Sequence, residues 1–109
     1  MYSKDMTAFS SKKSGCPVAL TLNIIGKKWA ALIIRDLLTG KKRFGELLAS
    51  LACISPRTLS ARLDELEQAG IITRRAFEEM PPRVEYGLTK RGTDLHRIID
   101  QMARWGSRS

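Results

Sequence analysis

The chain has 109 residues, of which 43% are hydrophobic and 28% are charged, and this is the composition of a folded domain. Its 19 lysines and arginines outnumber 11 acidic residues, so the formal net charge is +8 at pH 7. So basic a small chain favours an anionic partner, most often nucleic acid; the alternative is a basic surface with no such role. No apolar run reaches the ~18 residues of a membrane span, and residues 1–15 lack the apolar core of a signal peptide.

Helical spacing of apolar residues predicts three helices in the first half of the chain. The first follows Pro17 and ends before Gly26, the second ends at Gly40, and the third follows the basic residues 41–43. Their predicted apolar faces are, in chain order, Val18, Leu22 and Ile25, then Trp29, Leu32, Ile33 and Leu37, then Phe44, Leu47, Leu48 and Leu51.

A fourth helix, over residues 55–69, has clear signals at both ends. Ser55 is a good N-cap, and Pro56 suits the first helical position, where its missing N–H costs nothing. Gly70 can supply the left-handed turn that closes the helix. The predicted buried stripe is Leu59, Leu63 and Leu66.

Two strands, over residues 71–77 and 83–88, are predicted next. The segment between them contains two prolines, which remove two donors from any strand ladder. Thr89 is expected to cap a single last helix over residues 90–106. Four helices, a hairpin and a last helix predict one mainly α domain over residues 16–106. We expect a winged helix-turn-helix with a two-stranded β-hairpin wing and extra N- and C-terminal helices for dimerisation, preceded by a flexible arm.

The charges of the fourth helix run against its dipole. Arg57 and Arg62 come first, and the acidic residues 64, 65 and 67 come later, although a lone helix favours acids at its N-terminus. If Leu59 and its stripe are buried, the opposite face carries Arg57, Ala61, Asp64 and Gln68, with Arg62 at the edge of the stripe. This order of charges is favourable when a polyanion lies at the N-terminal end of the helix, because the helix dipole and Arg57 then attract the same phosphates.

This face suits a DNA major groove, where arginine reads guanine edges and hydroxyls bind phosphates or bases. Arginines in the predicted hairpin and the basic residues before the third helix would add contacts to the backbone or the minor groove. The candidate DNA-binding residues are Lys42, Arg43, Ser55, Arg57, Thr58, Ser60, Ala61, Arg62, Arg74, Arg75 and Arg83. The alternatives are a plain solvated surface, or a module for protein assembly or RNA binding, but the expected exposed face of residues 57–62 holds no large apolar anchor for a protein partner.

The first and last helices carry apolar stripes that a monomer of this size has little material to cover. Such stripes indicate association, and a dimer also suits DNA because two recognition helices match two half-sites. The candidate interface residues are Val18, Leu22, Ile25, Leu95, Ile98, Ile99, Met102 and Trp105. The alternative is packing of the two stripes within one chain.

Three stretches carry a family resemblance. They are "CPVALTLNIIGKKWAALIIRDLLTGKKRFGELL", "ISPRTLSARLDELEQAGIITRR" and "PPRVEYGLTKRG", with the Cys-Pro start, Gly-x-Lys-Trp of residues 26–29 and Pro-Arg-Val-Glu-Tyr of residues 82–86. The chain resembles the HxlR-type branch of the bacterial MarR-like winged-helix transcription regulators from Cys16 to Trp105. The resemblance implies a homodimer built on the first and last helices, the helix from Ser55 in the major groove, and residues 72–88 as the wing.

Two cysteines are too few for a secreted disulfide scaffold and indicate a reducing cytoplasm. Cys16 lies where many such regulators carry a cysteine that, in part of the family, senses oxidants or electrophiles. At a helix N-terminus its thiolate is stabilised by the dipole, with Lys12 and Lys13 nearby; the alternative is a structural cysteine. Cys53 lies in the turn before the fourth helix, a position freer in residue type in the family. Oxidation could join Cys16 to Cys53 of the other subunit, join two Cys16 thiols, or cap one with a small thiol.

The sequence favours neither catalysis nor a cofactor. The cysteines have no CxxC spacing and no base constellation beside them, and with His96 as the only histidine the ligands for a metal site are too few. A small aromatic effector held against Trp29 or Phe44 is an alternative signal, although these rings are more typical of a core. We therefore expect double-stranded DNA and a second copy of the chain as partners, no membrane, and an oxidant or a small molecule as effector.

Overall fold

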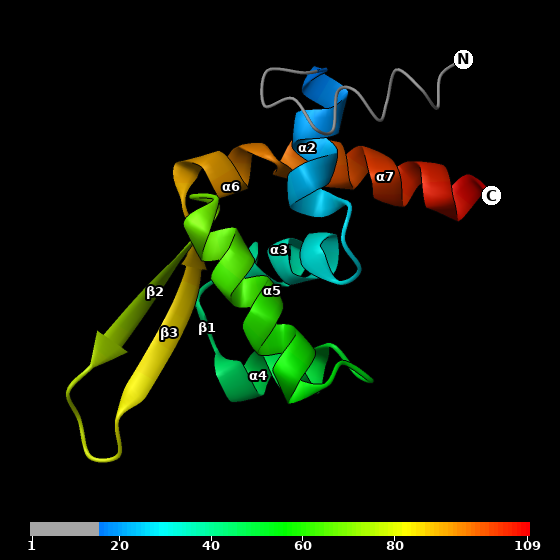
Figure 1. The fold of residues 1–109 in the computed structure, drawn as a ribbon. Helices are drawn as coiled ribbons and strands as arrows, with labels where there is room; N and C mark the ends of the chain where they lie inside the picture. The colour runs from blue at the N-terminus through cyan, green and yellow to red at the C-terminus, as the bar shows by residue number, and fades with distance from the viewer. Residues whose placement is uncertain (1–15) are drawn as a thin grey trace.

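The computed structural model describes residues 16–109, so the expected flexible arm at residues 1–15 lies outside the described residues. The helices are α2 (Pro17–Ile25), α3 (Ala30–Leu37), α4 (Phe44–Ser50), α5 (Pro56–Gln68), α6 (Lys90–Asp94) and α7 (His96–Arg108). The strands are β1 (Lys42–Arg43), β2 (Ile72–Phe77) and β3 (Arg83–Leu88). Figure 1 shows the β2–β3 hairpin projecting from a helical body, with α2 and α7 at the opposite end from α4. The winged helix-turn-helix prediction is confirmed.

The sheet has one strand more than the sequence predicted. The strand order is β1-β3-β2, and all pairs are antiparallel. Lys42 pairs with Tyr86 and Arg43 with Glu85, so β1 ties the start of α4 to the wing. A strand of two residues has no alternation to detect, and it exists only because β3 supplies its ladder partners. The wing itself is two-stranded, but it is the outer part of a three-stranded sheet.

The core lies where α3, α4, α5 and the base of the sheet meet, and α5 contributes its predicted stripe. The buried apolar residues are Ile25, Ala30, Ile33, Ile34, Leu37, Leu47, Ile54, Leu59, Leu63, Leu66, Ile71, Ile72, Tyr86, Leu95 and Ile99. Full burial of one such side chain contributes about 1.5–3 kcal/mol. This packing fixes which face of α5 turns away from the body.

The buried face of α3 differs from the prediction by one position. Leu32 is 47% exposed, whereas Ile34 is completely buried beside Ile33. The reason is the start of the helix: α3 begins at Ala30, so the stripe runs i, i+3, i+4, i+7 from that alanine. Trp29, which was expected to lie in the stripe, precedes the helix in a left-handed backbone conformation with φ 82° and packs against the core from the side.

The predicted last helix is two helices, interrupted at Leu95. Thr89 caps α6 as expected, because its hydroxyl accepts from the Gly92 amide at 3.0 Å. The first turn of α6 lies directly on the backbone before β2: a Cβ on Gly92 would meet the Ile71 carbonyl oxygen at 2.2 Å. This close approach holds α6 on the sheet, and α7 follows after the interruption at Leu95.

Within residues 16–109, the search for membrane spans finds no single helix of sufficient length and apolar character. The pair α2 and α3 passes that test only when taken together, and the two helices are bent by 76° at their junction.

Candidate nucleic-acid interface

The N-terminal end of α5 is held by the cap that the sequence predicted. The Ser55 hydroxyl accepts from the Thr58 amide at 3.0 Å and donates to the Thr58 hydroxyl at 2.9 Å. Pro56 occupies the first turn, and Gly70 adopts the left-handed φ of 77° at the far end. Ser55 and Thr58 therefore serve the cap and each other, and the first turn of α5 has a fixed backbone.

The outward face of α5 presents a small set of polar residues. Arg57, Ala61, Asp64 and Gln68 are exposed, as the helical spacing predicted, and Ser60 is exposed beside them. Among the ion pairs found within residues 16–109, none involves Arg57. The guanidinium at the front of the helix is therefore available for an external anion, at the end where the helix dipole is positive.

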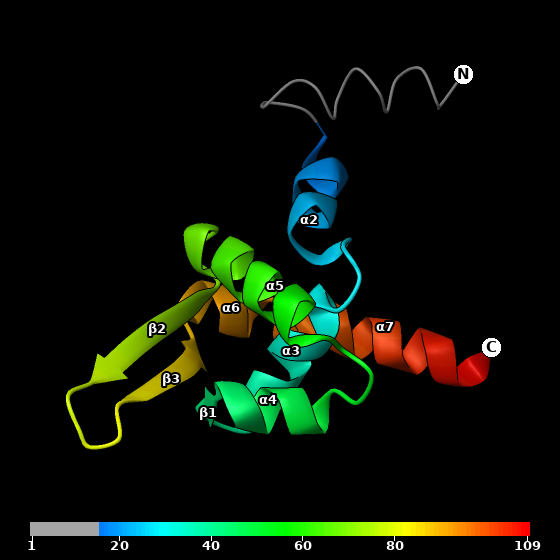
Figure 2. The same cartoon turned by 60° about the horizontal axis from the view of Figure 1, so that its bottom comes forward.

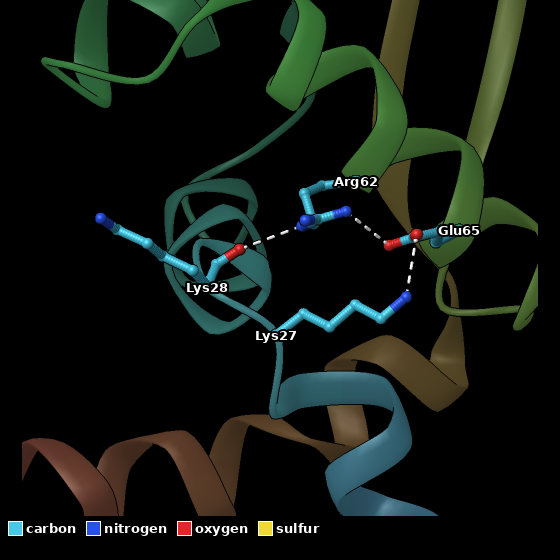
Figure 3. A network of polar contacts seen from close by, with 4 residues as sticks. All are labelled: Lys27, Lys28, Arg62 and Glu65. Carbon is cyan, nitrogen blue, oxygen red and sulfur yellow. Dashed lines mark hydrogen bonds and ion pairs between the residues drawn. The ribbon is translucent and has the colours of Figure 1, made fainter.

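Arg62, by contrast, is turned toward the body of the protein (Figure 3). Its Nε donates to the Lys28 carbonyl at 3.1 Å and its Nη1 lies 3.0 Å from the Glu65 carboxylate. Only 23% of the side chain is exposed. The structure thus separates Arg62 from the exposed residues with which the sequence grouped it. The sequence did not show this contact, because the carbonyl that Arg62 binds lies 34 residues away in the chain.

Glu65 is the centre of this network, which explains the acidic second half of α5. Its other carboxylate oxygen lies 3.0 Å from the Lys27 ammonium, so one carboxylate links Lys27 and Arg62. The hydrogen bond from Lys27 is the largest cause that lowers the pKa of Glu65 below its usual 4.5; burial opposes it, and the charges of Arg62 and Lys27 lower the pKa further. The reversed charge order therefore has two causes: Arg57 faces outward, and Glu65 pairs with cations of the protein itself.

The wing places Arg74 and Arg75 on its exposed surface. Arg83, the third predicted wing contact, is paired within the wing: its guanidinium lies 2.9 Å from Glu79 and 3.7 Å from Glu85. The side chain is only 26% exposed and lies over the Phe77 ring. The structure therefore leaves two wing arginines facing solvent, while Arg83 is internal to the hairpin.

The basic residues before α4 lie at the base of the wing. Arg43 is exposed and Lys42 is half-buried, both in β1 beside β3. The Arg43 amide donates to the Glu46 carboxylate at 2.7 Å, which fixes the first turn of α4. In both views α4 and the tip of the wing lie at the end of the molecule remote from α2, so these cations and those of the wing belong to one half of the molecule (Figures 1 and 2).

The two cysteines lie far apart in the chain's fold. Cys16 is the half-buried N-cap of α2, and its side chain makes no capping hydrogen bond. Cys53 is exposed in the connection between α4 and α5, with a left-handed φ of 79°. The start of α2 and the α4–α5 connection lie at opposite ends in both views, so a Cys16–Cys53 bond within one chain is excluded (Figures 1 and 2).

A second surface, on α2 and α7, is apolar and exposed. Val18 is 64% and Trp105 is 69% exposed. Its members are Val18, Leu20, Leu22, Ile98, Met102 and Trp105, and we call it the α2–α7 apolar surface. Three residues predicted for it belong to the core instead: Ile25, Leu95 and Ile99, which are 7%, 9% and 5% exposed. They lie on the side of each helix that faces the core. Leu20, which is exposed on α2, was not predicted for this surface.

The cavities do not support an aromatic-ligand site at Trp29 or Phe44, because both rings pack against the core. An apolar hollow between α2 and the last helices has a volume of about 280 Å³ and is lined by Leu20, Thr21, Ile24, Ile71, Arg91, Asp94, Leu95 and Ile98. Among residues 16–109, no three His, Cys, Asp or Glu side chains gather where they could hold a metal ion.

Comparison with known proteins gives consistent relatives. The family model described as HxlR-like helix-turn-helix matches residues 24–109. The uncharacterized HTH-type transcriptional regulator YybR of Bacillus subtilis is 44% identical over 94 residues, 86% of this chain and 75% of that protein. The redox regulator HypR in its oxidized form has a TM-score of 0.82 at 41% identity, and the match covers 86% of this chain and 97% of the HypR chain. Quinone-bound YodB from B. subtilis has a TM-score of 0.74 at 36% identity, and the match covers 86% of this chain and 99% of that chain.

Proposed function

The chain belongs to the HxlR-like helix-turn-helix family of transcriptional regulators, and from that membership we propose that it binds duplex DNA as a homodimer on a palindromic operator. The family is one of DNA-binding regulators and not of enzymes, in agreement with the interpretation that neither cysteine is catalytic. A regulator of this kind works in the cytoplasm, on the nucleoid.

The observation that carries the proposal is the front end of α5. Its backbone is fixed by the Ser55 cap, its outward face holds Arg57 without a protein partner among the described residues, and the face has no bulky apolar side chain. Such an end fits a major groove, with Arg57 on a base edge and Ser60 and Ala61 beside it. Arg74 and Arg75 of the wing, with Lys42 and Arg43, then contact phosphates.

The α2–α7 apolar surface supports the homodimer. Exposed apolar patches on this scale usually mark association, and a two-fold pairing buries the same surface on both subunits. A dimer carries two α5 helices, and these read two half-sites about one helical turn apart.

The presence of Cys16 and Cys53 favours oxidation as the signal to which this regulator responds. The relatives include a redox regulator and a quinone-bound structure, and in this chain Cys16 begins the first helix of the α2–α7 apolar surface. A change at Cys16 would act where two subunits meet, and Cys53 would act beside the front of α5. A bond between Cys16 and the other subunit's Cys53, a bond between two Cys16 thiols, and a small-thiol adduct remain separate forms of the proposal.

The experiment is selection of bound duplexes from a random DNA pool, under reducing conditions and again after mild diamide. We expect a palindromic motif with half-sites about one turn apart, and a weaker or shifted motif after diamide. Binding that depends on salt and not on sequence would reject the operator and leave the assembly or RNA interpretation. An unchanged motif after diamide would reject oxidation as the signal while keeping the regulator.

A further inference from the structure

The helix α2 stands apart from the body of the molecule, as Figure 2 shows. Ile25 is its only buried residue. The connection to α3 is four residues long, from Gly26 to Trp29, and turns the chain by 76°. The turn depends on Trp29, whose left-handed backbone an L-residue rarely adopts, and whose ring packs on the core.

Apolar packing between the end of α2 and α5 is incomplete. A small cavity of about 40 Å³ lies between them, lined by Asn23, Ile24, Lys27, Ala30, Glu65, Leu66 and Ala69. Beside this cavity, polar contacts join α5 to Lys27 and Lys28, which lie on the connection that follows the end of α2. Lys27 bonds Glu65 at 3.0 Å, Arg62 bonds the Lys28 carbonyl at 3.1 Å, and Glu65 joins the two cations (Figure 3).

We propose that Lys27, Arg62 and Glu65 form a brace that sets the orientation of α5 relative to α2, and so sets the half-site spacing that the dimer accepts. This inference rests on the proposed function. The three side chains do not touch DNA in it: they are positioning residues that act through α5. Arg62 accordingly moves from the predicted DNA contacts to the brace.

A small tilt of α5 at this contact produces a larger displacement at the front of the helix. Arg57 lies eight residues before Glu65, which is about 12 Å along the axis of a helix. A tilt of about 10° at Glu65 would therefore move Arg57 by about 2 Å. If α2 is fixed at the dimer axis, the tilt changes the distance between the two Arg57 side chains without changing the base that either one reads.

The test uses full-length protein and the operator found by selection, with half-sites separated by successive single base pairs. Wild type should bind one spacing best. Glu65→Gln, which keeps the shape but removes both ion pairs, should keep the half-site sequence while the preference for that spacing falls about two- to fivefold, the factor that loss of exposed ion pairs produces. Lys27→Met should have the same effect, and the double variant should add little, because both changes break one contact.

The matched control is Glu67→Gln, the same substitution two residues further along α5 at an exposed position. None of the ion pairs among residues 16–109 involves Glu67, so its spacing profile should equal that of wild type. A Glu65→Gln profile that superposes on wild type overturns the brace. Absence of any paired site for wild type rejects the proposed function instead, and the brace with it. If Glu65→Gln does not fold, Lys27→Met decides, because Lys27 lies on a connection and is 54% exposed.

Discussion

The guanidinium of Arg83 lies 4.1 Å from the centre of the Phe77 ring, directly across the hairpin from it. Arg75 approaches the same ring at 4.9 Å, so one aromatic ring lies against two cations. Glu79 and Glu85 then neutralise Arg83 and leave Arg75 without an ion pair among the described residues. The two arginines therefore have different surroundings, although the sequence assigned both to DNA.

The first prediction separates these roles by salt dependence. Arg74→Ala and Arg75→Ala should each weaken binding about equally on every sequence and lower the slope of log affinity against log salt by about 0.9, the value for one lost phosphate contact. Arg83→Ala should change the slope by less, because Glu79 and Glu85 already compensate its charge. Titrations of one operator at several salt concentrations measure the slopes. Equal slope changes for Arg75→Ala and Arg83→Ala would show that Arg83 leaves its pairs to contact DNA.

The second prediction concerns the front of α5. Arg57→Ala should cost about 1–3 kcal/mol of binding free energy and relax the preference at one base position, because a side chain that reads a base edge is lost. The matched control is Arg108→Ala, which removes the same charge at the end of α7. Binding of the variants to single-base operator substitutions measures the preference. An equal loss on all sequences would make Arg57 a phosphate contact.

Local signals account for the parts of the fold that the sequence predicted. Ser55, Pro56 and Gly70 act within a few residues of their own positions, and each has the role in the structure that its chemistry favours. The stripe through Leu63 follows from helical spacing alone, and it is fully buried. These features fix the ends and the outward face of α5, which is most of the candidate site.

The parts that were missed depend on contacts between distant segments. Lys42 enters a strand only because Tyr86 of β3 pairs with it, and Arg62 turns inward because the Lys28 carbonyl lies within reach. A helical stripe also does not show how much of it the chain itself covers, so Ile99 was grouped with Trp105 although one is 5% and the other 69% exposed. The interruption of the last helix at Leu95 is likewise recorded in no local pattern.

The third prediction concerns self-association. Trp105→Ala should shift the protein from dimer toward monomer, because large aromatic side chains dominate such interfaces. The stability of the monomer fold should change by no more than about 0.5 kcal/mol, since the side chain is 69% exposed. Sedimentation across a range of concentrations measures the dimer, and circular dichroism checks the fold. The control is Met80→Ala, an apolar residue of the wing tip that is 97% exposed. A Trp105→Ala protein that stays dimeric would place the interface elsewhere.

The fourth prediction assigns the thiols. After mild diamide, a bond between subunits should make wild type run as a dimer on a non-reducing gel, whereas a small-thiol adduct gives no such band. Cys16→Ser should abolish the band, because both intermolecular forms of the proposal use Cys16. Cys53→Ser distinguishes the forms: loss of the band indicates a Cys16–Cys53 bond between subunits, and its persistence indicates a bond between two Cys16 thiols. A band that survives Cys16→Ser would remove Cys16 as the sensor.

The last prediction uses pH to test the ion pairs of Glu65. Lys27 and Arg62 lower the pKa of Glu65 below 4.5, its usual value, in the folded chain. A carboxylate with a lowered folded pKa contributes stability above its unfolded pKa, and that contribution is lost as the pH falls through the folded pKa. Glu65→Gln should therefore unfold more easily than wild type at pH 7. The difference should be less than about 1 kcal/mol, because the side chain is 43% exposed and solvent screens the pairs.

As the pH falls from 4.5 through the lowered pKa of folded Glu65, the wild-type carboxylate gains a proton, and the two proteins should converge in free energy of unfolding. Urea unfolding at a series of pH values and one fixed protein concentration measures both curves. Glu67→Gln should show no such convergence with wild type, since Glu67 lies outside the brace. A Glu65→Gln difference that stays constant through the acid range would mean that the glutamine changes packing or helix propensity and not an ion pair. The spacing test of α5 would then have to rest on Lys27→Met alone.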